Sequence, residues 1–271
     1  MFRPRRPPRL RGLSLNRLIP NILTTAALCA GLTAIRFGLD KRWEPAVAAV
    51  LLAGVLDGLD GRIARLLRGS TRFGAELDSL SDFVSFGVAP ALLLYFWTMQ
   101  RAAGAGWALV MLYAVCCALR LARFNTMLGG GPDLPPWAAN FFTGVPAPAA
   151  AVLVLLPMMA SFQNGIAALC ALPAVNGVVL VGVSFLMISR VPTYSGKRLR
   201  VPVAYVLPVL LLVGVLAAAL VTTPWATVTL LGLLYLVSIP LSVRAFARLT
   251  RGNARAAAPA EAAEGEAPSK P

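Results

Sequence analysis

Four aspartates carry the most chemical information in this 271-residue chain. Asp57 and Asp60 lie three residues apart in one apolar stretch, and Asp78 and Asp82 lie four residues apart in the next. At these spacings the two members of each pair occupy one face of a helix. An aspartate in the middle of a bilayer costs about 2.5–3.5 kcal/mol on insertion scales, so acids in apolar segments indicate a function.

The short connection at residues 69–74 allows the two apolar stretches to pair as antiparallel helices. This pairing brings the four carboxylates together near the cytoplasmic surface, where they would repel one another unless cations neutralised them. Mg²⁺ or Mn²⁺ suits a site that is built from carboxylate oxygens and also holds phosphate. The sequence therefore predicts a divalent-metal site.

Histidine is absent from the chain, which excludes Ser-His-Asp and Cys-His catalysis. Any general base must therefore be a carboxylate, a lysine, a tyrosine or a cysteine. The cysteines lie in apolar stretches without the CxxC spacing of zinc sites, and we interpret them as packing residues. They are Cys29, Cys116, Cys117 and Cys170.

Glycine and arginine residues beside the aspartates suit an anionic ligand. Gly61 and Gly74 adjoin the carboxylates, and we interpret them as positions where a ligand approaches the backbone. Gly54 serves either this purpose or close helix packing. Arg65, two helical turns after Asp57, can reach a phosphate.

Residues 57–82 form the pattern Asp-x2-Asp-Gly-x2-Ala-Arg-x8-Gly-x3-Asp-x3-Asp. It resembles the signature of the CDP-alcohol phosphatidyltransferases at every fixed position. The resemblance implies a site for two Mg²⁺ or Mn²⁺ ions held by Asp57, Asp60, Asp78 and Asp82. By the same resemblance Asp57 bridges both ions, while Asp82 contacts the second ion and accepts the proton of the alcohol.

The resemblance also implies a pocket for the CDP group of the lipid substrate. The residues that match its positions are Gly61, Ala64, Arg65 and Gly74. Thr71, Asn21 and Thr24 are similar to further residues that face the nucleotide. For Asn21 and Thr24, a role in starting or packing the first helix is an alternative.

The sequence from 77 to 91 looks like the branch of the family that uses serine. Further similarity lies in 120–125, 142–148 and 191–197. The resemblance implies the substrates CDP-diacylglycerol and L-serine, a direct attack of the serine hydroxyl on the β-phosphorus, and a homodimer. Because the carboxylate of serine needs a cation, Arg120 and Arg123, one turn apart, are the candidates for binding it, with membrane anchoring as the alternative.

Membrane helices are the elements that must position these residues. The chain is 58% hydrophobic and only 13% charged, far more apolar than soluble domains. Apolar runs of about bilayer-crossing length follow one another at 18–37, 45–67, 77–99, 105–124, 142–162, 166–189, 201–222 and 225–243. We predict an all-α fold, a polytopic membrane helical bundle of about eight transmembrane helices.

Charge divides the chain into three parts. Residues 1–17 are predicted to form a basic cytoplasmic segment, 18–246 the transmembrane catalytic domain, and 247–271 a disordered tail. The net charge of +14 comes from basic residues between the apolar runs and not from one basic stripe, so the lipid bilayer and not nucleic acid is the expected partner. The positive-inside rule places both termini and the active site on the cytoplasmic side of a cell (inner) membrane.

Other functions remain open on sequence alone. Glycerol phosphate and inositol phosphate are acceptors in other branches of the family, but the Ser-Leu-Ser-Asp-Phe segment at 79–83 argues against them. An archaeal ether lipid could replace diacylglycerol. A divalent cation transporter is a more remote alternative, because it would need acids along a path through several helices.

Overall fold

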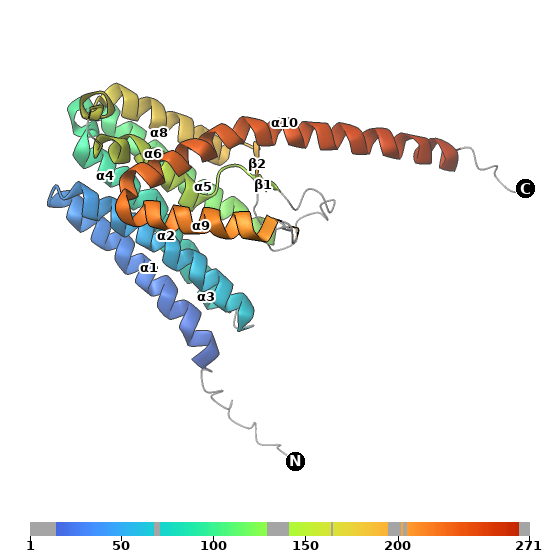
Figure 1. The fold of residues 1–271 in the computed structure, drawn as a ribbon, viewed down its shortest axis with the longest axis horizontal. Coiled ribbons are helices and arrows are strands. Elements are labelled where there is room, and N and C mark those ends of the chain that lie inside the picture. The colour runs from blue at the N-terminus through green and yellow to red at the C-terminus, as the bar shows by residue number, and fades with distance from the viewer. Residues whose placement is uncertain are drawn as a thin grey trace, which may run out of the picture.

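A computed structural model describes residues 15–67, 71–128, 141–163, 165–194, 202 and 205–265. Within these ranges the chain is a helical bundle, as predicted, and Figure 1 shows the helices lying alongside one another with α10 leading away from them. The longer helices are α1 (Leu15–Leu39), α2 (Trp43–Leu66), α3 (Arg72–Asp82), α4 (Ala89–Trp97), α5 (Ala103–Leu128), α6 (Ala147–Ser161), α8 (Pro173–Ile188), α9 (Val206–Thr222) and α10 (Pro224–Gly265). The short elements are η1 (Phe83–Val88), η2 (Met99–Ala102), α7 (Ala167–Cys170), β1 (Phe141–Thr143) and β2 (Pro192–Tyr194).

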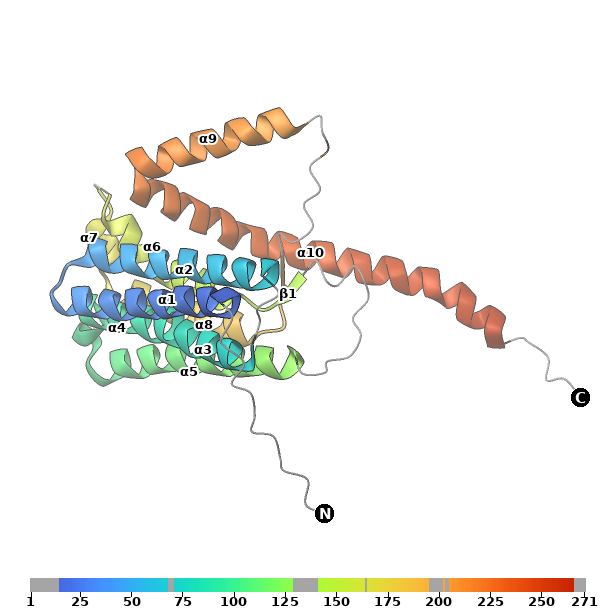
Figure 2. The ribbon, with the colours of Figure 1, turned by 90° about the horizontal axis from the view of Figure 1, so that it is seen from below.

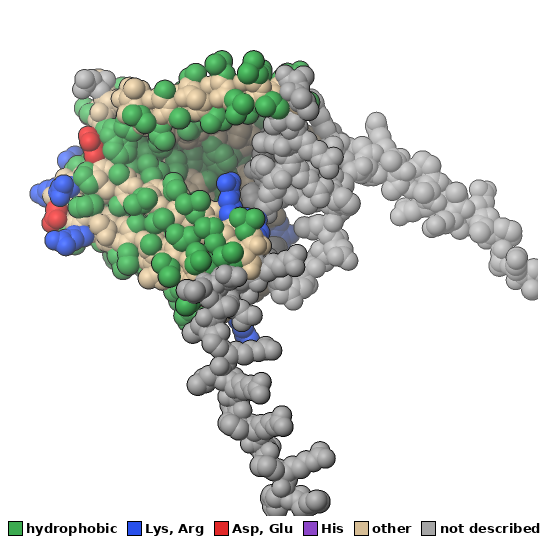
Figure 3. All heavy atoms as spheres, turned by 60° about the horizontal axis from the view of Figure 1, so that its bottom comes forward, with side chains coloured by type: hydrophobic (Ala, Val, Ile, Leu, Met, Phe, Trp, Pro, Cys, Tyr) green, Lys and Arg blue, Asp and Glu red, His purple; other side chains and the backbone are tan. Residues whose placement is uncertain are grey.

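Helical segments long and apolar enough to cross a membrane make this an integral membrane protein. They are Leu18–Leu39, Arg72–Trp97, Met99–Thr126 and Pro224–Ala247, and α6, α8 and α9 are shorter apolar helices. Hydrophobic side chains cover much of the face shown in Figure 3, with acidic and basic side chains at one end and further basic side chains towards the other. Helix α2 is as long as the others, but its apolar run is interrupted by two aspartates and two arginines.

Small residues let α1 approach its neighbours closely, and Figure 2 shows α1 and α2 side by side. Ala27 and Ala34 on α1 and Ala53 on α2 are almost fully buried. A β-carbon on Gly31 would lie only 2.5 Å from the hydroxyl oxygen of Ser85. This interface, which is typical of membrane helices, fixes α1 against the two helices that carry the aspartates.

A π-helical turn, η1, joins α3 to α4 directly after Asp82. Its wider turn changes which face the following residues present, and such turns are frequent at functional sites. The hydroxyl group of Tyr113, which is fully buried on α5, donates a hydrogen bond of 2.8 Å to the carbonyl oxygen of Phe86 inside this turn. The start of α4 is thereby tied to α5.

A two-stranded antiparallel sheet is the feature that the apolar runs did not predict. Strand β1 pairs with β2 through Phe142 opposite Thr193, so the helix expected from 142 begins only at Ala147. Gly144 has a φ of +78°, and a β-carbon there would lie 2.8 Å from the carbonyl oxygen of Met187. Because only glycine fits this conformation comfortably, the chain leaves the helical path here.

Helix α10 continues to Gly265, into the segment 247–271 for which disorder was predicted. Alanine, glutamate and arginine are frequent in this segment and are strong helix formers. Most of the basic segment, 1–14, and the last residues, 266–271, lie outside the described residues.

Candidate metal centre and nucleotide cavity

The structure brings the carboxylates of α2 and α3 together. One oxygen atom each from Asp57, Asp60 and Asp78 lies within 4.8 Å of the other two. The carboxyl group of Asp82, one turn after Asp78, lies beside that of Asp57. All four predicted aspartates therefore meet at the packed faces of the two helices.

This donor set fits a hard divalent cation. Two oxygens on opposite sides of one Mg²⁺ ion lie about 4.2 Å apart, because each bond is about 2.1 Å long. The three carboxylate oxygens lie within 4.8 Å of one another, so their separation exceeds the distance between opposite ligands of one Mg²⁺ ion by less than about 1 Å. Asp60 is only 4% exposed, so a buried negative charge there needs a cation or strong hydrogen bonds.

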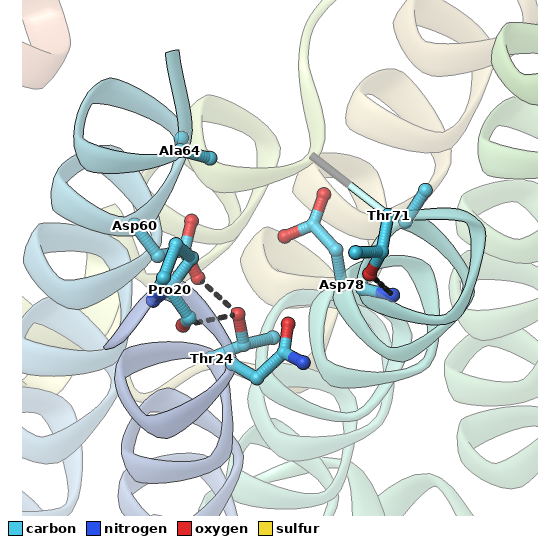
Figure 4. Close-up of a pocket in the computed structure, with 10 residues that line it drawn as sticks. Pro20, Thr24, Asp60, Ala64, Thr71 and Asp78 are labelled. Carbon is cyan, nitrogen blue, oxygen red and sulfur yellow. Dashed lines mark hydrogen bonds between the residues drawn. The ribbon is translucent and has the colours of Figure 1, made fainter. Parts of the chain in front are cut away.

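Thr24 on α1 holds Asp60 in place. Its hydroxyl group lies 2.6 Å from Oδ2 of Asp60 and 3.0 Å from the carbonyl oxygen of Pro20 (Figure 4). The backbone carbonyl of Thr24 accepts a 3.2 Å hydrogen bond from the hydroxyl group of Ser81 on α3. One residue of α1 therefore contacts both helices that carry the aspartates, a role that sequence reasoning missed.

A cavity of about 180 Å³ opens beside the cluster, and Asp60 and Asp78 face one another across it in Figure 4. Its lining residues are Pro20, Asn21, Thr24, Asp60, Gly61, Ala64, Thr71, Gly74, Ala75 and Asp78. Six of the seven residues expected around the nucleotide are among them. Arg65 is not, because its side chain is exposed and its Nε donates a hydrogen bond to the carbonyl oxygen of Gly61 on its own helix.

The two glycines of the pattern differ in their surroundings. A β-carbon on Gly61 would meet no atom within 4 Å, which leaves room for a ligand against the backbone. A β-carbon on Gly74 would lie 2.8 Å from Oδ1 of Asn21 and 3.1 Å from Oγ1 of Thr71. The hydroxyl oxygen of Thr71 also accepts a hydrogen bond from the backbone N–H of Gly74 and caps α3, so Gly74 both lines the cavity and allows close packing of α3 against Asn21.

The two arginines that are candidates for binding the serine carboxylate differ in their hydrogen bonds. Arg123 donates hydrogen bonds to the carbonyl oxygens of Ile188 and Thr143, at 3.0 and 3.3 Å, and thus joins α5 to α8 and to β1. Arg120 interacts electrostatically with Asp82, and its buried Nε has no hydrogen-bond partner among the described residues. Arg120 is the arginine that remains available to a ligand.

Two further polar residues near the cluster escaped sequence reasoning as site residues. Asn125 donates a 2.9 Å hydrogen bond to the hydroxyl group of Ser79, between the two aspartates of α3. Tyr235 on α10 interacts electrostatically with Arg120. Asn125 could have been identified from the sequence, because it ends the segment 120–125 that is similar to the family. Tyr235 lies in an apolar run and has no such distinguishing pattern.

Known proteins resemble the chain over most of its length. The sequence model of a family described as CDP-alcohol phosphatidyltransferase matches residues 17–188, and that of CDP-alcohol phosphatidyltransferase 2 matches 204–240.

Two mycobacterial relatives, each described as a CDP-diacylglycerol–serine O-phosphatidyltransferase, are 40% identical. The one from Mycobacterium leprae aligns over 88% of this chain and 78% of its own length, and the one from Mycobacterium tuberculosis H37Rv over 88% and 82%. An archaetidylserine synthase from Methanothermobacter thermautotrophicus is 33% identical over 64% of this chain and 68% of its own.

Proposed function

The chain belongs to the CDP-alcohol phosphatidyltransferase family, and we propose that it transfers the phosphatidyl group of CDP-diacylglycerol to the hydroxyl group of L-serine. The products are phosphatidylserine and CMP. The observation that carries the proposal is the meeting of four aspartates from α2 and α3 beside a cavity lined by residues of the family pattern. The names of the mycobacterial relatives support serine as the acceptor.

Asp82 is the proposed general base. In the transfer, the serine oxygen forms a bond to the β-phosphorus, the bond between this phosphorus and the oxygen of CMP breaks, and the hydroxyl proton passes to the Asp82 carboxylate. Asp82 suits this role because it interacts electrostatically with Arg120, and neither residue is among the described residues that line the nucleotide cavity. No covalent intermediate with the protein is required.

Asp57, Asp60, Asp78 and Asp82 are the proposed ligands of two Mg²⁺ or Mn²⁺ ions. When bound, these ions would neutralise the pyrophosphate and stabilise the negative charge on the departing CMP. The chain's own contribution is to hold the ligand oxygens in position, which Thr24 does for Asp60. Gly61, Ala64, Thr71, Asn21 and Thr24 line the cavity proposed for the CDP group, while Gly74 shapes it by packing.

Arg120 is the proposed partner of the serine carboxylate, because its guanidinium interacts with Asp82 and its Nε is unpaired among the described residues. Arg123 is the weaker candidate, because two backbone carbonyls already accept its hydrogen bonds. A carboxylate beside Arg120 would position the serine hydroxyl near Asp82.

Several finer features are part of the proposal. The basic residues that flank the helices support an inner-membrane protein with the active site and both termini in the cytoplasm. The family resemblance supports a homodimer. Reporter fusions at the C-terminus test the orientation, and light scattering in detergent tests the oligomeric state.

Release of CMP by the purified protein in detergent tests the function. Serine, glycerol 3-phosphate, inositol phosphate and no acceptor are compared with Mg²⁺ or Mn²⁺ and either CDP-diacylglycerol or its ether-linked counterpart. Serine-dependent release with a phosphatidylserine product is expected. Release only with another acceptor would replace serine, preference for the ether lipid would favour the archaetidylserine reaction, and no release at all would favour transport of cations.

A further inference from the structure

The C-terminal helix α10 is held in place by elements that do not line the nucleotide cavity. It packs on β2, where the hydroxyl group of Ser242 donates a hydrogen bond to the carbonyl oxygen of Pro192. Strand β2 is in turn tied to Gly144, whose carbonyl oxygen accepts a 3.0 Å hydrogen bond from the hydroxyl group of Thr193. These bonds fix the position of α10 relative to the two-stranded sheet.

Tyr235 projects from this fixed part of α10. Its hydroxyl oxygen is buried and has no hydrogen bond of standard geometry to any described residue, although it lies close to Thr193 and interacts with Arg120. The Nε of Arg120 is buried and unpaired in the same way. Buried donors without an acceptor are rare in proteins because each one loses its hydrogen bonds to water. Two such donors that interact electrostatically with each other indicate a site for an acceptor from outside the described residues.

The carboxylate of an amino acid fits this pair of donors. Arg120 interacts electrostatically with both Asp82 and Tyr235, so its charge connects the proposed general base with α10. In serine only two carbon atoms separate the hydroxyl oxygen from the carboxylate carbon, so a hydroxyl group at Asp82 places the carboxylate a few ångströms away. The positive charge of Arg120 attracts a carboxylate and repels an ammonium group, and a carboxylate has oxygens for both donors.

We propose, on the basis of the proposed function, that Tyr235 determines acceptor specificity by donating a hydrogen bond to the serine carboxylate beside Arg120. The acceptor site is then completed by α10, more than 150 residues along the chain from Asp82. The nucleotide cavity contains no residue of α10, so the binding of CDP-diacylglycerol does not depend on the Tyr235 hydroxyl.

Replacing Tyr235 with phenylalanine tests the proposal, because it removes the hydroxyl group and keeps the ring. Steady-state CMP release is measured with serine and CDP-diacylglycerol varied in turn. We expect the KM for serine to rise about tenfold, as for the loss of a hydrogen bond to a charged group. The KM for CDP-diacylglycerol should stay unchanged. Tyr205→Phe is the matched control, because Tyr205 is exposed at the start of α9 and should keep wild-type constants.

An unchanged KM for serine in Tyr235→Phe would overturn the proposal. So would an equal rise in both KM values, or a loss of kcat together with a lower thermal unfolding temperature, since each of these results assigns Tyr235 to packing. CMP release by the wild-type protein distinguishes a failure of this proposal from a failure of the proposed function. A wild-type protein that releases CMP only with an acceptor other than serine contradicts the proposed function itself and removes the serine carboxylate from the site.

Discussion

At the scale of single residues, the four aspartates have the same chemistry but different neighbours. Asp60 accepts a hydrogen bond from the hydroxyl group of Thr24, whereas Asp82 interacts with Asp57 and Arg120. A carboxylate that receives a fixed hydrogen bond is oriented as a metal ligand. A carboxylate beside a ligand-accessible arginine is instead placed where an acceptor arrives, and this difference separates holding a metal ion from removing a proton.

Replacing Asp82 with asparagine should lower kcat at least 100-fold, because the amide cannot accept the serine proton. Binding of CDP-diacylglycerol should weaken much less, since the cavity residues and three aspartates remain. Measuring turnover and lipid binding on the same preparation checks this prediction. Equal losses of turnover and binding would assign Asp82 to metal binding alone.

Thr24→Val removes the hydroxyl group that orients Asp60 and keeps the shape of the side chain. We expect the Mg²⁺ or Mn²⁺ concentration needed for half-maximal activity to rise about 10-fold or more, as for the loss of a neighbour that positions a metal ligand. Thr25→Val is the control, because the hydroxyl group of exposed Thr25 bonds only to the carbonyl oxygen of Asn21 on its own helix. Identical metal dependence in both variants would contradict this role of Thr24.

At the scale of elements, the close packing of α1 against η1 depends on Gly31. A β-carbon at this position would lie 2.9 Å from the backbone Cα of Ser85, which cannot move without shifting η1. Gly31→Ala should therefore destabilise the protein by about 1–3 kcal/mol, the usual cost of overfilling a packed site.

Thermal unfolding in detergent measures this effect. Gly214→Ala on α9 is its control, since a β-carbon there meets nothing within 4 Å and alanine favours helix. Gly31→Ala should unfold at a lower temperature than the wild type, and Gly214→Ala should not. A wild-type unfolding temperature for Gly31→Ala would show that α1 and η1 are free to separate.

The sequence predicted the helices and the meeting of the aspartates well, because apolar runs and helical spacing are local signals. It did not predict the two-stranded sheet, where Gly144 departs from helical backbone geometry and pairing joins residues about 50 positions apart. Spacing also could not show that Gly74 packs against Asn21 or that Arg123 is already bonded to backbone carbonyls. These details depend on tertiary contacts between distant segments.

At the scale of the whole molecule, the bundle gathers four carboxylates in one place among largely apolar helices. Ions that bind this site in the folded protein stabilise it relative to the unfolded chain. Removing divalent cations with EDTA should therefore abolish CMP release and lower the thermal unfolding temperature, and adding Mg²⁺ or Mn²⁺ should restore both. Full activity after complete removal of divalent ions, checked by metal analysis, would contradict a metal-dependent reaction.

The bond from Thr24 to Asp60 also bears on how the protein is made. Each of α2 and α3 carries two aspartates, which reduce its own tendency to leave the translocon for lipid. Helix α1 contains no acidic residue and is synthesised first, so it is already in the membrane when α2 emerges from the ribosome. The Thr24 hydroxyl of α1 offers Asp60 on α2 a hydrogen-bond partner, so we expect α2 to insert into a membrane more readily when α1 precedes it than when α1 is removed.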